Sequence, residues 1–254
     1  LAVSPPAALS PDSFKGQGAD ERLKELSALL PGISLRRVPR LARLALRAAL
    51  EVKPENEQPL GLIMVSAYGS VSSTFEFLDS IITDGAEMAS PTAFSHSVTN
   101  MSAAYLSQFL KINGPCLTLN QRSLPDALTA AEALLANGRI EGILLGVAAE
   151  KPEMMKAIEL EAGHSTLPPD EGAVFFHLSR PNPDKEEVWL INKKSGSSSP
   201  PADQLNLDQT QLLSIALRLA IICDRFETVS IHITCGPVNS LIEIKKSGGF
   251  SDSA

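Results

Sequence analysis

Apolar and polar positions along the chain follow two periods, one typical of buried strands and one typical of helices. Apolar runs that fit buried strands lie at residues 60–66, 116–120, 142–147, 187–192 and 229–234, and residues 171–178 open with a turn and become a strand. Stretches typical of helices lie at residues 75–84, 100–110, 124–136, 154–160 and 209–225. Residues 90–95 are predicted to form a loop. Strands that alternate with helices in this way predict an α/β fold, with helices on the faces of a layered sheet.

The composition changes near each end of the chain. Residues 1–33 are rich in Pro, Ser and Gly and predict an irregular lead-in with one helical stretch near residues 19–30. Residues 34–245 are expected to form a single domain, followed by a tail at 246–254 without a core-forming pattern. The domain opens with an arginine-rich helix whose apolar residues share one face. Its arginines form either a solvated helix face or a docking patch for an acidic partner protein, and they include Arg36, Arg37, Arg40 and Arg43.

Composition and charge narrow the class of protein. The 254 residues are 44% hydrophobic and 20% charged, which permits a sizeable core and argues against wholesale disorder. A net charge of −7 and an aromatic content of 5% disfavour a nucleic-acid-binding surface. The three cysteines form no Cys-x-x-Cys pair, so we expect a reducing, cytoplasmic setting. No apolar run reaches the ~18 to 20 residues of a membrane span.

Motifs for metal or cofactor chemistry are lacking in the sequence. The four histidines are scattered and have no metal-ligand spacing. Neither a Walker loop nor a Gly-x-Ser-x-Gly elbow is present. We therefore expect no metal and no cofactor.

The segment from Leu60 to Glu150 carries four short motifs in a fixed order. They are Ser-Ala-Tyr-Gly-Ser at 66–70, Ser-Pro-Thr-Ala-Phe-Ser-His-Ser-Val-Thr-Asn at 90–100, Gly-Pro-Cys-Leu-Thr at 114–118, and Ala127-Leu128 followed by Gly138 and Gly146. Together they resemble the N-terminal half of a β-ketoacyl synthase, a member of the thiolase-like superfamily. The resemblance covers about residues 34–180 and is greatest for a shortened, divergent branch of that family.

This resemblance implies a mixed five-stranded sheet in a helix–sheet–helix sandwich. It also implies a second ketosynthase-like subunit, in a heterodimer or a homodimer, paired through the edge strand at 116–120, because an exposed strand edge is a ready template for pairing. The family reaction is the decarboxylative Claisen condensation of acyl and malonyl thioesters on acyl carrier protein, which makes that carrier protein an expected partner of the arginines. Residues expected at the acyl tunnel or subunit interface are Ser90, Phe94, Asn100, Cys116, Thr118 and Asn120.

A ketosynthase needs a cysteine at a strand-to-helix elbow, where the helix N-terminus lowers the thiol pKa. Counting forward from Gly114-Pro115 places this position at Ser123, and counting back from Gly138 places it at Gln121. Neither is a cysteine, and non-catalytic chain-length-factor subunits typically carry a glutamine there. Ser123 also fits a helix N-cap, because a proline and an acidic residue follow in the first turn. Cys116 comes too early for the elbow and is expected to be a small buried residue.

The catalytic histidines of the family have no clear counterparts. Residues 230–236 faintly resemble the family strand that ends at the first of them, but Thr234 or Cys235 takes that place. His232 lies two residues before Thr234 on the same face of the strand. The second histidine is expected to lie beyond the residues present.

These residues leave three functions open. The first is a non-catalytic, chain-length-factor-type subunit that pairs with a complete β-ketoacyl synthase in polyketide, aryl-polyene or fatty-acid-type synthesis. The second is a diverged acyl-thioester acyltransferase that uses Ser123 or a displaced cysteine. The third is a scaffold that keeps only the fold. The missing cysteine and the missing second histidine favour the first.

Overall fold

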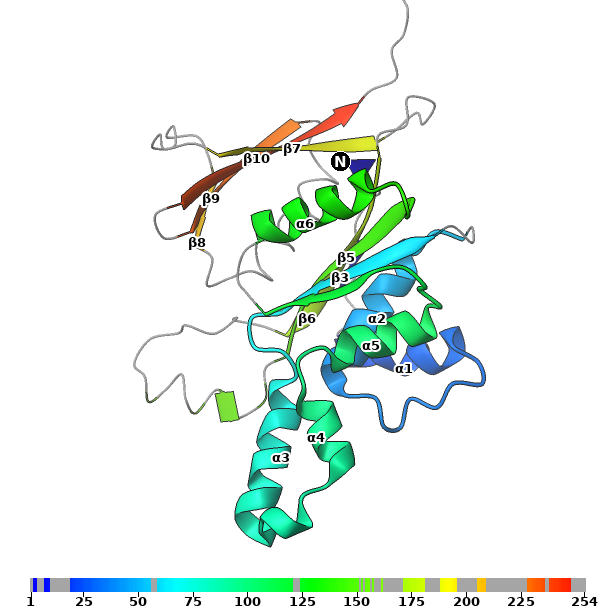
Figure 1. Cartoon of the computed structure of the whole chain (residues 1–254), viewed down its shortest axis with the longest axis vertical. Helices are drawn as coiled ribbons and strands as arrows, with labels where there is room; N and C mark the ends of the chain where they lie inside the picture. Colours follow the sequence, from blue (N-terminus) through cyan, green and yellow to red (C-terminus); the bar gives the residue numbers. More distant parts are fainter. Residues whose placement is uncertain are drawn as a thin grey trace, which may run out of the picture.

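The computed structural model (Figure 1) describes a layered α/β chain. It describes residues 2–3, 7–9, 19–55, 59–120, 124–150, 152, 154–155, 157, 161, 171–180, 188–195, 205–208, 228–235 and 238–247. The helix predicted at residues 209–225 lies outside these ranges. None of the described helices is long and apolar enough to cross a membrane.

A mixed sheet of four strands forms the centre of the fold. Strand β3 (Leu60–Val65) lies between β4 (Cys116–Leu119) and β5 (Gly142–Ala149), and all three run parallel. Strand β6 (Gly172–Ser179) pairs with β5 in the antiparallel sense, in a register that sets Gly142 opposite Ser179. The strand order is β4-β3-β5-β6, which leaves β4 at one edge of the described sheet.

The expected fifth strand is replaced by two short ones. Strands β1 (Ala2–Val3) and β2 (Ala7–Leu9) both pair antiparallel with β6. The expectation of a single fifth strand was wrong. Neither β1 nor β2 is long enough to pair along all eight residues of β6, so each pairs with only part of it. Strand β1 also pairs with β7 (Val188–Ser195). The sheet continues from β7 through β10 (Val238–Ser247) and β9 (Thr228–Cys235) to β8 (Leu205–Asp208).

Helices cover both faces of the four-stranded sheet, so the α-β-α layering expected from the sequence is confirmed. Helices α2 (Arg40–Val52) and α5 (Met101–Phe109) pack on one face, and α6 (Leu124–Ala136) contacts β3 and β5 and lies on the other side of the sheet in Figure 1. Every residue of β3 and β5 is buried. A parallel sheet covered on both faces produces such uninterrupted apolar runs.

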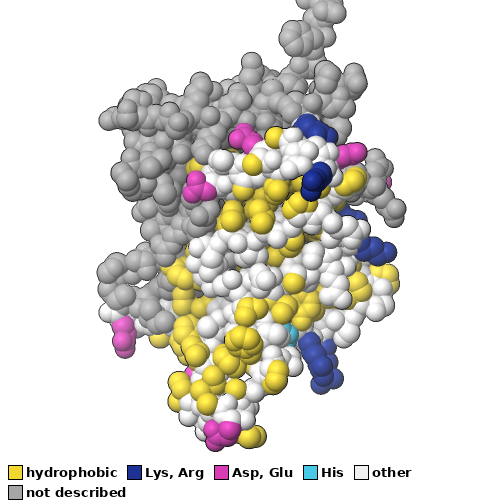
Figure 2. All heavy atoms as spheres, in the orientation of Figure 1, with side chains coloured by type: hydrophobic (Ala, Val, Ile, Leu, Met, Phe, Trp, Pro, Cys, Tyr) yellow, Lys and Arg dark blue, Asp and Glu magenta, His cyan; other side chains and the backbone are white. Residues whose placement is uncertain are grey.

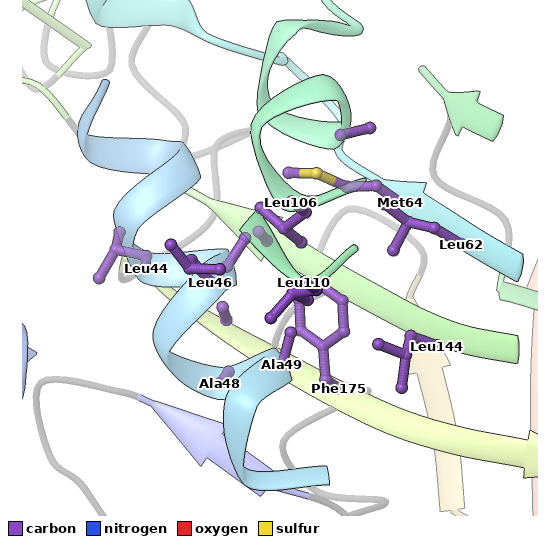
Figure 3. Packing of buried hydrophobic residues seen from close by; sticks show 14 of the residues in the cluster. Leu44, Leu46, Ala48, Ala49, Leu62, Met64, Leu106, Leu110, Leu144 and Phe175 are labelled. Atoms are coloured by element: carbon purple, nitrogen blue, oxygen red, sulfur yellow. The ribbon is translucent and has the colours of Figure 1, made fainter. Parts of the chain in front are cut away.

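Successive residues of each strand contribute to opposite layers. Leu62 and Met64 of β3, with Leu144 of β5, belong to a cluster with the apolar faces of α2 and α5 (Figure 3). Ile63 of β3 and Ile143 of β5 are equally buried but are not members of that cluster, in agreement with the two-residue period. The apolar stripe of the arginine-rich helix therefore covers the sheet, as its spacing predicted.

The lead-in is more ordered than its composition indicated. Helix α1 (Ala19–Leu29) packs on α2, and Leu26 and Leu30 are buried in the core. Arg47 of α2 forms ion pairs with Glu51 and, at 3.4 Å, with Glu25 of α1. The helical stretch predicted near residues 19–30 is confirmed by α1, and the short strands β1 and β2 were not predicted because they depend on pairing with distant strands. The domain boundaries at residues 34 and 245 stay a prediction, although β10 extends to Ser247.

A helical hairpin projects from the carboxyl end of β3 (Figure 1). It consists of α3 (Val71–Asp84), the 3-10 turn η1 (Ala86–Met88) and α4 (Pro91–Ser97). The sequence predicted a loop at residues 90–95, and this was wrong. Ser90 caps α4 by accepting a hydrogen bond of 3.3 Å from the Ala93 N–H, and Pro91 occupies the first helical position.

One close contact fixes how β5 and β6 pack. Gly146 lies opposite Phe175 in the antiparallel pair, and a Cβ atom at Gly146 would overlap the aromatic ring. Phe175 is fully buried in the cluster shown in Figure 3. The glycine is therefore required for the ring to lie flat over the strand.

We predict that Gly146→Ala lowers the free energy of unfolding by about 1–3 kcal/mol, because overpacking displaces a buried ring. Urea denaturation measures the change. In a Phe175→Leu background the same substitution should cost less, since a smaller side chain leaves room. An equal cost in both backgrounds would contradict this explanation.

Candidate functional site

The carboxyl ends of the parallel strands meet at one edge of the sheet. Ser66 follows β3, Asn120 follows β4 and Glu150 follows β5. Ligand sites in open α/β sheets form at this edge, outside the ends of the strands. It is also where the sequence predicted the elbow, so we treat it as the candidate site.

The loop after β3 turns tightly beside the end of β4. Gly69 has a φ of +63°, and its N–H donates a 3.1 Å hydrogen bond to the Ser66 Oγ. A Cβ atom at Gly69 would lie 3.3 Å from Thr99 Cγ2 and 3.6 Å from Asn120 Oδ1. The predicted interface residue Asn120 therefore lies against the turn that leads into α3.

Two buried serines connect this loop to α5. The Ser70 Oγ lies 3.4 Å from the Ser102 Oγ, and the two residues are 1% and 0% exposed. Each hydroxyl thus finds a partner within the protein. The small residues of α5 allow this approach, since Ser102 and Ala103 are both buried.

Glu150 is the titratable side chain buried at this edge, and sequence reasoning missed it. It is 4% exposed, and its Oε1 accepts a 2.8 Å hydrogen bond from the Ser72 N–H in the first turn of α3. A second backbone hydrogen bond comes from Leu41 in the first turn of α2. One carboxylate therefore stabilises two helix N-termini, whose partial positive charge favours an anion.

Burial outweighs these hydrogen bonds in setting the protonation of Glu150. Burial raises the pKa of the carboxyl above its usual value, the hydrogen bonds from Ser72 and Leu41 oppose that rise, and the charge of Glu171 adds to it. The only sequence signal was an acidic residue directly after a wholly apolar strand. That signal says nothing about the two helices that reach it.

The elbow itself falls between β4 and α6. Strand β4 ends at Leu119 and α6 begins at Leu124, with Asp126 in its first turn, so the predicted helix start is confirmed. Gln121 and Ser123 lie outside the described residues. Which of the two occupies the elbow stays a prediction.

Cys116 lies at the opposite end of β4 from the elbow. Asn120 is four residues farther along the chain, a distance of about 13 Å in an extended strand. We expected a buried side chain, and this was wrong, because β4 is an edge strand and Cys116 is exposed. Partial burial raises the pKa of its thiol, a hydrogen bond with Ser107 opposes the rise, and the Sγ lies 3.8 Å from the Ala103 carbonyl oxygen. A protonated thiol at this place is a poor nucleophile.

His232 and Cys235 lie in β9, far along the strand order from β4. Among the described strands β9 pairs with β10 and β8, and His232 is opposite Leu241 and Asn206. Strand pairing therefore does not bring these two residues to the candidate site.

The arginines divide into two groups. Arg36 and Arg37 are exposed in the turn before α2. Arg40 is engaged within the protein, since its Nε lies 3.0 Å from Glu171 Oε2 and its Nη2 lies 2.8 Å from Asp20 Oδ1. The hydrogen bond with Glu171 holds the pKa of Arg40 above its usual value. Arg43 is half-buried. Docking of a carrier protein at Arg36 and Arg37 stays a prediction.

The remaining predicted interface residues lie at the surface. Ser90, Asn100 and Phe94 are exposed, and Thr118 is half-buried in the edge strand. Phe94 is 56% exposed and packs its ring against Phe77 of α3, with 5.6 Å between the centroids. In the described part of the chain no three His, Cys, Asp or Glu side chains converge as a metal ion would need.

A family model described as "Beta-ketoacyl synthase, N-terminal domain" matches residues 12–190. The chain belongs to this family. The resemblance found in the sequence is therefore confirmed, and so is the expected thiolase-like fold class. A search of curated proteins gives no match.

Solved structures of ketosynthases share the fold. One is the ketosynthase ApeO in complex with its chain length factor ApeC from Xenorhabdus doucetiae, with 16% identity, a TM-score of 0.66, and coverage of 96% of this chain and 99% of that chain. Another is the ishigamide ketosynthase/chain length factor, with 14% identity, a TM-score of 0.68, and coverage of 97% and 99%. A β-ketoacyl synthase from Burkholderia phymatum has 12% identity and a TM-score of 0.63, with coverage of 97% and 99%. At such identities the likeness shows the fold of the β-ketoacyl-synthase-like chain.

We predict that Glu150→Gln changes how stability depends on pH. The folded state binds the Glu150 proton more tightly than the unfolded chain does, so this residue favours folding at low pH. Its contribution is lost as pH rises above the ordinary glutamate pKa of 4.5. Glutamine keeps an oxygen acceptor for Ser72 and carries no charge. Relative to the wild type, the variant should therefore gain stability between pH 4 and pH 7.

Urea denaturation at several pH values measures this difference. Glu141→Gln is the matched control, because Glu141 is exposed just before the same strand. Its stability should follow the wild-type pH curve. Parallel curves for Glu150→Gln and the wild type would refute the assignment.

Proposed function

We propose that this chain is a non-catalytic ketosynthase-like subunit of the chain-length-factor type, which pairs with a complete β-ketoacyl synthase. The observation that carries the proposal is the lack of a cysteine where β4 leads into α6. Residues 117–125 read Leu-Thr-Leu-Asn-Gln-Arg-Ser-Leu-Pro. Cys116 lies at the far end of the strand, with its thiol pKa raised. Without a thiolate at a helix N-terminus, thioester capture loses its nucleophile.

One surface supports a pairing role. Strand β4 is an edge strand whose first residues, Cys116 and Leu117, are exposed. Unpaired N–H and C=O groups along such an edge are a template for another strand. The family membership and the ketosynthase/chain-length-factor complexes among proteins of this fold agree with such a partner.

The two subunits of the proposed pair have different roles. The partner carries out decarboxylative condensation of acyl and malonyl thioesters delivered by acyl carrier protein. This chain contributes the hairpin side chains and the residues at the end of β4 as a wall of the partner's acyl tunnel. Ser90, Phe94, Asn100, Thr118 and Asn120 are the residues we assign to that wall or interface.

We predict that the chain co-purifies in a one-to-one complex with the β-ketoacyl synthase encoded beside it. Leu117→Lys should weaken that complex at least tenfold, because a charge at the centre of β4 must be desolvated on pairing. Leu29→Lys is the matched control, since Leu29 is exposed on α1, away from the edge strand. Equal losses for both variants, or no complex with the wild type, would argue against the proposal.

We also predict that the chain takes up no acyl group. Intact-mass spectrometry after incubation with acyl- and malonyl-loaded carrier protein should show the unmodified mass. The partner ketosynthase is the positive control. An adduct mapped to Ser123 or to a cysteine would instead establish the acyltransferase, and its loss in Ser123→Ala would identify the nucleophile.

A further inference from the structure

The hairpin α3–η1–α4 has almost no core of its own. Val71 and Ser73, at its base, are its buried residues, and no residue of η1 or α4 is buried. The Thr74 Oγ1 donates a 3.2 Å hydrogen bond to the Ser97 carbonyl, which ties the two helices at that base. Farther out, the Phe77–Phe94 contact holds them together. The hairpin contacts the rest of the described protein at its base, where α4 meets α5, Val71 packs with Met155, and the Ser72 N–H donates to Glu150.

Large apolar side chains gather on this projection. The exposed fractions are 45% for Leu78, 81% for Ile82, 69% for Met88 and 56% for Phe94. Leu78 and Ile82 are four residues apart and share a helix face. Figure 2 shows hydrophobic atoms concentrated over this end of the molecule. Contiguous apolar surface on a projecting element is typical of an interaction site.

The charges on the hairpin all have one sign. No Lys or Arg occurs between Lys53 and Lys111, whereas Glu76, Asp79, Asp84 and Glu87 lie within the hairpin. All four carboxylates are exposed. The apolar side chains are thus set among anionic groups.

Asp84 shows that this charge is unfavourable for the hairpin alone. It is the last residue of α3, where the helix dipole is negative, and the last turn of α3 contains no basic residue. An anion at a helix C-terminus destabilises the helix, and a cation there stabilises it. A cation supplied from outside would pair with both the carboxylate and the helix end.

We propose that the hairpin is a docking surface for an apolar face flanked by Lys and Arg on the partner ketosynthase, and that its carboxylates disfavour the pairing of two copies of this chain. This inference rests on the proposed function for the identity of the partner. The hairpin is continuous with the edge strand, because α4 contacts α5 and α5 packs on β4. A symmetric pair would bring both hairpins into one interface, with the four carboxylates of each and no hairpin Lys or Arg, so like charge would accumulate there and oppose pairing. A partner with basic residues there removes that repulsion and gains attraction.

The test neutralises three of the four hairpin carboxylates and leaves the apolar side chains intact. Asp79→Asn/Asp84→Asn/Glu87→Gln removes three exposed carboxylates from the hairpin. Glu55→Gln/Glu132→Gln/Glu141→Gln removes three exposed carboxylates elsewhere and changes the net charge equally. Both sets are solvent-exposed, so the fold should be retained.

The first measurement is binding to the ketosynthase encoded beside this chain. At 50 mM NaCl the hairpin variant should raise the dissociation constant at least tenfold, and the control variant less than twofold. At 500 mM NaCl the difference should shrink, because salt screens exposed charges. A complex that forms with equal affinity for the hairpin and control variants would overturn the docking inference while leaving the proposed function standing.

The second measurement is sedimentation velocity of the chain alone. The wild type and the control variant should stay monomeric at low salt, and the hairpin variant should self-associate there. If the wild type binds no ketosynthase at any salt concentration, the proposed function fails and with it the assigned partner. If the wild type, the control variant and the hairpin variant self-associate equally, the inferred repulsion between hairpins is refuted, whatever the outcome of the binding measurement.

Discussion

The burial of β3 and β5 on both faces is the constraint on which the rest of the structure depends. Since every residue of these two strands is buried, helices must cover both faces of the sheet. The loops that connect strands to helices therefore lie at the ends of the strands. Parallel strands then end at one edge, where Ser66, Asn120 and Glu150 meet. The same arrangement leaves β4 uncovered along its outer side. The site and the pairing edge are thus two consequences of one packing requirement.

Sequence reasoning succeeded where local pattern and tertiary environment agree. The buried strand predicted at residues 60–66 is β3, and the Ser-Leu-Pro-Asp start of the helix at 124–136 leads into α6. Sequence reasoning failed where a residue's environment depends on segments far away in the sequence. Cys116 has the apolar neighbours of a buried strand, yet edge position decides its exposure, and that depends on strand order. Glu150 could not be assigned, because its hydrogen-bond partners lie at residues 41 and 72.

The loop predicted at residues 90–95 failed for a different reason. Serine and proline are common in turns. The same pair begins a helix when the serine side-chain oxygen accepts a hydrogen bond from the backbone N–H three residues later, as Ser90 does from Ala93. Composition cannot separate these two uses. The helical outcome gives the hairpin its second helix, and with it the exposed Phe94.

The polar groups at the candidate site serve the backbone. Ser66 accepts from the Gly69 N–H, and Glu150 accepts from the Ser72 N–H. Groups committed to loop and helix ends in this way hold the fold and do not present a free acid or base. The edge strand and the hairpin, by contrast, present exposed apolar side chains at the surface. These exposed apolar surfaces agree with the proposed subunit that shapes a neighbour's reaction.

The pairing of β1 also affects how the chain is made. Ala2 pairs with Ser179 and with Leu190, so β1 joins the two parts of the sheet only after the chain has been synthesised as far as Leu190. During translation β1 and β2 stay unpaired until β6, their partner strand, has been synthesised. Contacts this far apart in sequence slow folding, because loop closure precedes any gain from pairing. The nascent polypeptide consequently spends longer with open strand edges than a chain built from local contacts would.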